Sequence, residues 1–263
     1  MARVADKFRT EVSTWAELAE LVEHFSLFSG HAWLFRGVTD EKHGLVPKVG
    51  RPQTRAKKKI KGRKVRVPYR LEDERAIFEM FKQQARSHLS PAPQKPLEWL
   101  AIAQHFGMPT RLLDWTESLL VATWFAVERG GADRDAALWV SRGIETIPLD
   151  FDGDPFALNK PKCYRPPHIT ARISTQASVF VICPKPTREV ELPFIRKIII
   201  KKDAQFTIKK RLNACGINRR NLFPDLSGLS DHLAWMYKHD WLAGYRPSAM
   251  TATERSSSLD ETD

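Results

Sequence analysis

The sequence predicts an α+β fold in which a mixed, mainly antiparallel sheet packs with helices around a buried central helix. Helical and strand-like patterns alternate along the chain, and from residue 169 onward the pattern turns to β. The stretch 117–127 is apolar nearly all round, which is typical of a helix enclosed by protein. The chain has 263 residues and 42% hydrophobic content, which is enough to build a sizeable core.

The individual elements follow from apolar spacing and from the residues at their ends. Apolar residues at helical spacing predict helices over 15–25, 71–89, 97–106, 117–127 and 207–215. Runs rich in β-branched and aromatic residues predict strands over 31–38, 136–140, 169–184 and 194–201. Ser13 or Thr14 is expected to cap the first helix, and Ser230 a short helix near the C-terminus.

The joint between the two central helices contains residue types that interrupt helices. Gly107 suits a left-handed position after the first helix, and Pro109 cannot continue that helix. Thr116 is expected to cap the second helix, with Glu117 in its first turn. The residues between them are therefore predicted to form a turn.

Polar residues gather at this joint, namely Gln104, His105, Thr110, Arg111 and Asp114. Arg111 and Asp114 flank two leucines, and because an unpaired buried charge is strongly unfavourable, each is expected to have a partner nearby. Two interpretations stay open: an internal brace that fixes the turn, or a group of side chains that faces a cleft. For His105, a structural role and a role in proton transfer or substrate binding are equally open.

Composition argues against several classes of protein. No run of about 18 apolar residues exists, so no membrane span is expected, and the first ten residues lack the apolar core of a signal peptide. The three cysteines, Cys163, Cys183 and Cys215, lack the paired spacing of a zinc site or a disulfide framework. We expect a cytoplasmic protein without a metal site, in which Cys163 is inert filler more readily than a nucleophile.

Positive charge is concentrated in one segment. The net charge is +11, and residues 51–66 hold nine Lys or Arg and no acid. Because the segment has no apolar periodicity, residues 51–67 are predicted to form a mobile, basic inserted loop that is either simply solvated or contacts RNA or DNA. The residues expected to contact nucleic acid are Lys57, Lys58, Lys59, Lys61, Arg63 and Lys64. No aromatic residue is interleaved before Tyr69, so base reading by the loop itself is not predicted.

Other polar residues lie beside predicted core elements. Arg36 ends an apolar strand, and its planar fork of donors can bind a phosphate or a carboxylate. Arg172, Ser174 and Gln176 lie at the head of a later predicted strand. Since structural need alone would favour apolar residues there, these side chains and those of the central joint are candidates for one pocket that binds an anionic small molecule.

Several stretches together resemble one family, the FRG domain. The resemblance rests on Phe35–Gly37, Pro47, residues 103–116, residues 172–180 and residues 216–229, although Ala177 stands where such proteins usually have glycine. It implies a single domain over residues 1–245 that includes the N-terminal helix and the basic loop. FRG domains often occur near bacterial defence or mobile-element genes, so the resemblance implies a defence or toxin context without supplying a reaction. Residues 246–263 are rich in Ser, Thr and acid and are expected to be a disordered tail.

A more distant resemblance is to ADP-ribosyltransferases of the Arg-Ser-Glu type. These enzymes place an arginine before a glycine on their first strand and have a Ser-Thr-containing strand farther along the chain. Arg36, Ser174–Thr175 and the pattern Glu189-x-Glu191 are similar to these elements. The resemblance implies NAD as the cofactor, with Arg36 on its pyrophosphate and a carboxylate that stabilises an oxocarbenium-like transition state. The chain lacks a Gly-rich phosphate loop, which argues against a Rossmann-type nucleotide site.

Two functions follow from these observations. The first is an ADP-ribosyltransferase-like enzyme that binds NAD or a related anionic nucleotide, with His105 and Glu191 as catalytic residues. Its expected ligand-binding residues are Arg36, Gln104, Arg111, Asp114, Arg172, Ser174 and Gln176. The alternative is a non-catalytic module that binds nucleic acid through the basic loop, the central joint then being architectural. The enzyme hypothesis requires Arg36 to lie within about 15 Å of His105 or Gln176, and the oligomeric state stays open.

Overall fold

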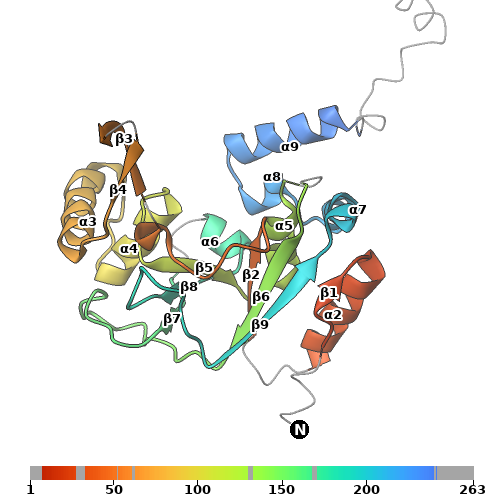
Figure 1. The fold of residues 1–263 in the computed structure, drawn as a ribbon, viewed down its shortest axis with the longest axis horizontal. Helices are drawn as coiled ribbons and strands as arrows, with labels where there is room; N and C mark the ends of the chain where they lie inside the picture. Colours follow the sequence, from red (N-terminus) through yellow and green to blue (C-terminus); the bar gives the residue numbers. More distant parts are fainter. Residues whose placement is uncertain are drawn as a thin grey trace, which may run out of the picture. The chain divides into compact units, whose positions relative to one another are not determined.

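A computed structural model describes residues 8–27, 33–51, 53–60, 63–129, 133–167, 171–239 and 241. It confirms the α+β class, because helices pack with a mixed seven-stranded sheet (Figure 1). The chain divides into two compact units, Met1–Ile217 and Asn218–Asp263, and the sheet belongs to the first. The single domain over residues 1–245 stays a prediction, and the tail over residues 246–263 lies outside the described residues.

The sheet is mainly antiparallel, as the sequence predicts, with the strand order β1-β9-β6-β2-β5-β8-β7. Its strands are β1 (Glu11–Val12), β2 (Leu34–Val38), β5 (Leu112–Thr116), β6 (Ala136–Arg142), β7 (Lys162–Tyr164), β8 (Ser178–Ile182) and β9 (Phe194–Ile200). The edge strand β1 runs parallel to β9, and the other neighbours in this described sheet are antiparallel.

The predicted helices over 15–25, 71–89, 97–106 and 207–215 correspond to α2, α3, α4 and α7. The helices of the first unit are α2 (Trp15–Leu27), α3 (Leu71–Ala85), α4 (Pro96–His105), α5 (Leu119–Val127), α6 (Ala171–Thr175) and α7 (Lys202–Ala214), with short 3-10 turns η1 (Lys48–Gly50) and η2 (Arg86–His88). The second unit contains α8 (Arg219–Leu222) and α9 (Leu226–Lys238). Thr14 caps α2, because its Oγ1 accepts a hydrogen bond from the backbone N–H of Glu17 at 3.2 Å.

The joint between α4 and α5 is a strand and not a turn. Residues Leu112–Thr116 form β5 in the middle of the sheet, because their two leucines and their tryptophan can be buried on both faces of a strand. The predicted cap at Thr116 is also wrong: α5 begins two residues later, and the Ser118 side chain accepts the hydrogen bond from Val121. Seven of the nine residues of α5 are buried.

Three further expectations are wrong. Residues 171–175 form the short helix α6 and not a strand, and Ala177 turns the chain into β8 with a φ of 44°. The basic segment, which was expected to be an inserted loop without strands, contains two: β3 (Gln53–Ile60) and β4 (Arg63–Val67) pair as an antiparallel hairpin with a register shift between Thr54 and Lys59. Asp225, and not Ser230, caps α9, because the Asp225 carboxylate reaches the N–H of Gly228.

The two faces of the sheet carry separate apolar clusters. Leu112 and Phe180 belong to a cluster formed with residues of α3 and α4, whereas Leu113 and Val181 belong to another that includes Leu45. Adjacent strand residues point to opposite faces, so the two clusters lie on opposite sides of β5 and β8. Figure 1 shows α3 and α4 at the β5–β8–β7 end of the sheet, where they cover the first cluster.

The sheet is nearly split between β2 and β5. β2 pairs with β6 over five residues, and β5 pairs with β8 over five residues, whereas β2 and β5 share the single pair Phe35 and Thr116. Beyond this pair, backbone groups on the facing edges need other partners. Arg36 is the residue that follows Phe35 on β2, so its side chain begins where the two strands separate.

Candidate functional site

The Arg36 side chain occupies the split in the sheet. Its Nη1 donates a hydrogen bond of 2.5 Å to the backbone carbonyl oxygen of Asp114 and lies 3.7 Å from the Asp114 carboxylate. Only 14% of the side chain is exposed. Its buried Nε has no hydrogen-bond partner among the residues that the structure describes. The guanidinium therefore replaces part of the missing strand pairing and still has donor capacity left.

The electrostatic surroundings of Arg36 are strained. Burial lowers the pKa of the guanidinium, the Asp114 carboxylate opposes that change, and the positive charge of Arg51 adds to it. An arginine nevertheless remains charged in a protein, because the ordinary pKa of its guanidinium is far above neutral pH. Arg36 is thus a buried cation whose charge is only partly balanced, because the Asp114 carboxylate is 59% exposed to solvent.

The Asp114 carboxylate is held in a fixed orientation by a chain of hydrogen bonds from α4 and from the segment before β5. Gln104 Nε2 donates to both carboxylate oxygens at 3.1 Å. Thr110 Oγ1 in turn donates to Gln104 Oε1 at 2.6 Å, which fixes the amide orientation. An oriented, solvent-exposed carboxylate therefore lies beside a buried guanidinium. The guanidinium can bind the anionic part of a ligand while the carboxylate accepts hydrogen bonds from a polar part of the same ligand.

Arg111 is the internal brace that was one of the two interpretations of the central joint. Its guanidinium donates to Glu74 Oε1 at 3.1 Å and to Glu74 Oε2 at 2.6 Å, and the exposed fractions of the two side chains are 1% and 2%. Tyr69 and the carbonyl oxygen of Phe156 accept further hydrogen bonds from it. Glu74 was not among the expected site residues, although the sequence holds a signal for its burial: Glu74 falls on the same helical stripe as Phe78 and Ala85.

Two more of the predicted residues lie near the Arg36 cluster. His105 directly follows Gln104 at the end of α4 and is half-buried. The backbone carbonyl oxygen of Gln176 accepts a hydrogen bond of 2.7 Å from Thr116 Oγ1, two residues from Asp114. The end of α6 is therefore tied to the end of β5. Arg172 and Ser174 lie on α6 itself, half-buried and exposed respectively.

The Glu189-x-Glu191 pattern lies outside the helices and strands. Both carboxylates are exposed on the segment between β8 and β9, and the side chain of Glu189 packs against Gly44. Glu191 forms no hydrogen bond or ion pair with another residue in the described part of the chain. The carboxylate that accompanies Arg36 is Asp114.

The thiols of two cysteines are poorly placed for nucleophilic chemistry. Cys163 and Cys183 are buried, and burial raises the pKa of both thiols, that of Cys183 to about 12. Only the thiolate is a strong nucleophile, so both groups are unreactive near neutral pH. Cys215 is exposed. None of the helices in the described ranges is long and apolar enough to cross a membrane.

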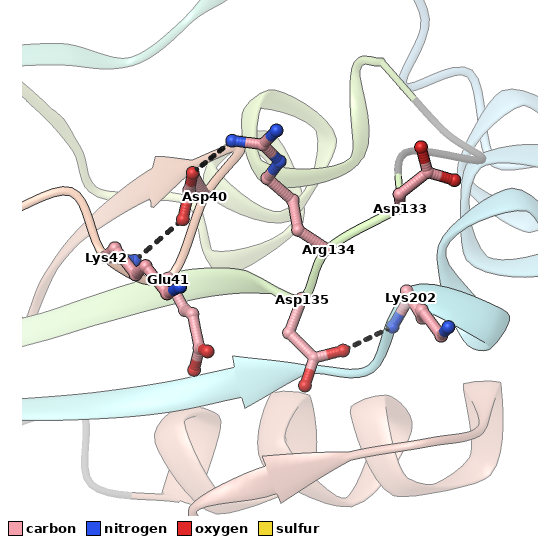
Figure 2. Close-up of a pocket in the computed structure, with 7 residues that line it drawn as sticks. All are labelled: Asp40, Glu41, Lys42, Asp133, Arg134, Asp135 and Lys202. Atoms are coloured by element: carbon pink, nitrogen blue, oxygen red, sulfur yellow. Dashed lines mark hydrogen bonds and ion pairs between the residues drawn. The ribbon is translucent and has the colours of Figure 1, made fainter.

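A second polar feature went unnoticed in the sequence (Figure 2). A hollow of about 540 Å³ is lined by Asp40, Glu41, Lys42, Asp133, Arg134, Asp135 and Lys202. Arg134 pairs with Asp40 at 2.6 Å, and the Asp135 carboxylate accepts a hydrogen bond of 2.8 Å from the backbone N–H of Lys202. Among the described residues, no group of three or more His, Cys, Asp or Glu is arranged to hold a metal ion.

Fold and site together define an α+β domain in which a buried arginine faces a solvent-exposed carboxylate at a split in the sheet. The family model of the FRG domain matches residues 31–135, a span that contains Arg36, Gln104, Arg111 and Asp114. An FRG domain is therefore present in this chain. No curated protein and no solved structure matches the chain.

Proposed function

We propose that the cluster around Arg36 binds a small anionic ligand, and that the protein is an ADP-ribosyltransferase-like enzyme that uses NAD. The observation that carries this proposal is the buried guanidinium of Arg36, whose Nε has no partner among the described residues. Buried guanidinium groups are normally satisfied by hydrogen bonds and opposite charge. The oxygens of a pyrophosphate match both needs, because they carry charge and accept two parallel N–H bonds.

The remaining residues of the cluster suit the transfer reaction. In that reaction the bond between ribose C1 and the nicotinamide nitrogen breaks, the electron pair leaves with nicotinamide, and a nucleophile of the acceptor takes its place at C1 and loses its proton. A carboxylate beside the sugar stabilises the positive charge that develops there. We assign this role to Asp114, which Gln104 orients beside Arg36. His105 follows Gln104 and is the candidate base for the acceptor's proton.

Arg36→Gln is expected to weaken NAD binding by about 10- to 100-fold, because a hydrogen bond to a charged group contributes roughly 1.5–3 kcal/mol. Calorimetric titration with NAD and with ADP-ribose measures the effect. Arg196→Gln is the matched control, since Arg196 is an exposed arginine on β9, and this variant should bind NAD as the wild type does.

Asp114→Asn should keep NAD binding and slow nicotinamide release by about 100-fold, because the carboxylate that stabilises the charge on the sugar is lost. A wild-type protein that neither binds NAD nor releases nicotinamide from it excludes the enzyme.

A second candidate function is nucleic-acid binding through the basic hairpin. The specific observation in its favour is that the nine basic residues of 51–66 fall on and around two paired strands, β3 and β4, and not on an irregular loop. Release of counterions from the phosphates would supply most of the affinity of such a basic element.

Changing Lys57, Lys58 and Lys59 together to alanine is expected to make the salt dependence of nucleic-acid binding less steep. If all three lysines neutralise phosphates, the slope of log K against log salt should fall in magnitude by about 2 to 3. Fluorescence anisotropy with a labelled oligonucleotide between low and moderate salt gives this slope. The matched control changes three exposed lysines elsewhere, Lys42, Lys160 and Lys202. Equal slopes for the two triple variants would argue against the hairpin as the contact.

A further inference from the structure

A hollow of about 380 Å³, which Asp114 does not line, lies between the loop after β8 and the segment that follows β4. Its lining residues are Tyr69, Leu71, Arg111, Phe156 and the run 184–188. This volume is within the range of about 300–1,000 Å³ that is typical of ligand pockets. Neither of the two proposed functions assigns a role to this hollow.

The hollow lies at the root of the basic hairpin. Tyr69, in its lining, comes two residues after the last residue of β4. On the other side of the hairpin, Gly50 lies so close to the loop after β8 that an added Cβ would be 1.6 Å from the carbonyl oxygen of Pro186. Since Pro186 also lines the hollow, the hairpin leaves and rejoins the domain beside it.

Two aromatic rings in the hollow are held in fixed positions. The Tyr69 hydroxyl donates to Glu74 Oε2 at 2.6 Å and accepts from Arg111 Nη2 at 3.1 Å. The Phe156 ring is contacted by the guanidinium groups of Arg111 at 4.7 Å and of Arg75 at 4.9 Å. A ring that is already ordered loses little conformational entropy when a planar group stacks on it. Every nucleobase has such a planar face.

The rim of the hollow is positive. Lys185 and Arg188 are exposed, and their side chains have no hydrogen bond or ion pair to another residue of the described ranges. No acidic residue is among those that line the hollow. By contrast, the hollow of Figure 2 contains four carboxylates, and the hollow of about 400 Å³ between α2 and α5 contains Glu117 and no cation. Of these three hollows, only the one beside Tyr69 combines aromatic rings with unpaired cations.

We propose that this hollow receives one unpaired nucleotide of a single-stranded nucleic acid whose backbone the hairpin holds. The base stacks on the ring of Tyr69, and Lys185 and Arg188 bind the phosphate groups on either side. The inference rests on the second proposed function, nucleic-acid binding, and adds to it the preference for a single strand. A fully paired duplex cannot place a base in the hollow without opening a pair.

The test compares a labelled 12-nucleotide single strand with the duplex of the same sequence, by fluorescence anisotropy at one salt concentration. The wild type is expected to bind the single strand at least about 5-fold more tightly, which is the lower end of what one stacked base contributes. Lys185→Ala with Arg188→Ala should remove most of this preference. Lys42→Ala with Lys202→Ala removes two exposed lysines of the hollow in Figure 2 and should leave it unchanged.

A second measurement uses the unaltered protein, so it does not depend on whether a Tyr69 variant folds. A strand with 5-iodouracil at each position in turn is irradiated in the complex, and the cross-linked peptide is identified by mass spectrometry. We expect one cross-link to Tyr69. Equal affinity for single strand and duplex, or cross-links only to the hairpin, would contradict binding of a nucleotide in the hollow. Neither result would contradict nucleic-acid binding by the hairpin. Absence of any binding by the wild type overturns both.

Discussion

Replacing Glu74 with alanine is expected to lower the free energy of unfolding by about 3–5 kcal/mol. The reason is that Glu74 supplies the only negative charge bonded to the Arg111 guanidinium in the described structure, and both side chains are almost fully buried. Without that carboxylate, Arg111 keeps its positive charge inside the apolar cluster of α3 and α4. Urea unfolding followed by circular dichroism measures the change.

The control for Glu74→Ala removes both charges at once. Glu74→Leu combined with Arg111→Met fills a similar volume with apolar atoms, and such replacements of buried ion pairs are often neutral or stabilising. The double variant should therefore be clearly more stable than Glu74→Ala alone. If the free energy of unfolding of Glu74→Ala is within about 1 kcal/mol of that of the wild type, the pair is not the brace that its geometry indicates.

Gly37→Ala is expected to be the second strongly destabilising change, by about 3 kcal/mol or more, because an overpacked contact with main chain on both sides cannot relax easily. A Cβ at Gly37 would lie 1.9 Å from the carbonyl oxygen of Ala122 and 2.6 Å from the backbone nitrogen of Ala126, both on α5. Either β2 or α5 must move, and Arg36 is the adjacent residue. Thermal unfolding gives the stability change, and calorimetry shows whether NAD binding falls with it.

Gly107→Ala is the matched control for this substitution. Gly107 has a φ of 87°, and a Cβ there would meet no atom within 4 Å. Its replacement should therefore cost only the left-handed backbone strain, about 1–2 kcal/mol. A Gly37→Ala variant that loses no more stability than Gly107→Ala would show that the close approach of β2 and α5 can relax.

Arg111 and Asp114 show how much of the candidate site could be predicted from the sequence. The cost of an unpaired buried charge predicted a nearby partner for each, and this reasoning holds for Arg111, which is buried and pairs with Glu74. Asp114 also has a partner, Gln104, but its carboxylate is exposed, so burial does not require that contact. The sequence left open whether the two residues form a brace or face a cleft. The structure divides them between these roles: Arg111 is internal, and Asp114 is 59% exposed beside Arg36.

The sequence-based predictions were wrong where a short segment was compatible with more than one secondary structure. Residues 112–116 look like a turn between helices, yet pairing with β8 makes them a central strand. Residues 171–175 look like the start of a strand, yet they form α6, because Ala177 turns the chain before β8 begins. Pairing partners far along the chain decide such segments, and local propensity does not contain that information.

The sequence by itself determined the α+β class, the positions of the long helices and the concentration of charge in residues 51–66, because periodicity and composition are local properties. Tertiary structure alone decided which polar residues meet. Asp114 reaches Arg36 because β2 and β5 separate after one pair, and Glu74 reaches Arg111 because α3 and β5 contribute to the same apolar cluster. These contacts join residues 37 to 78 positions apart, and only chain packing brings such residues within hydrogen-bond distance.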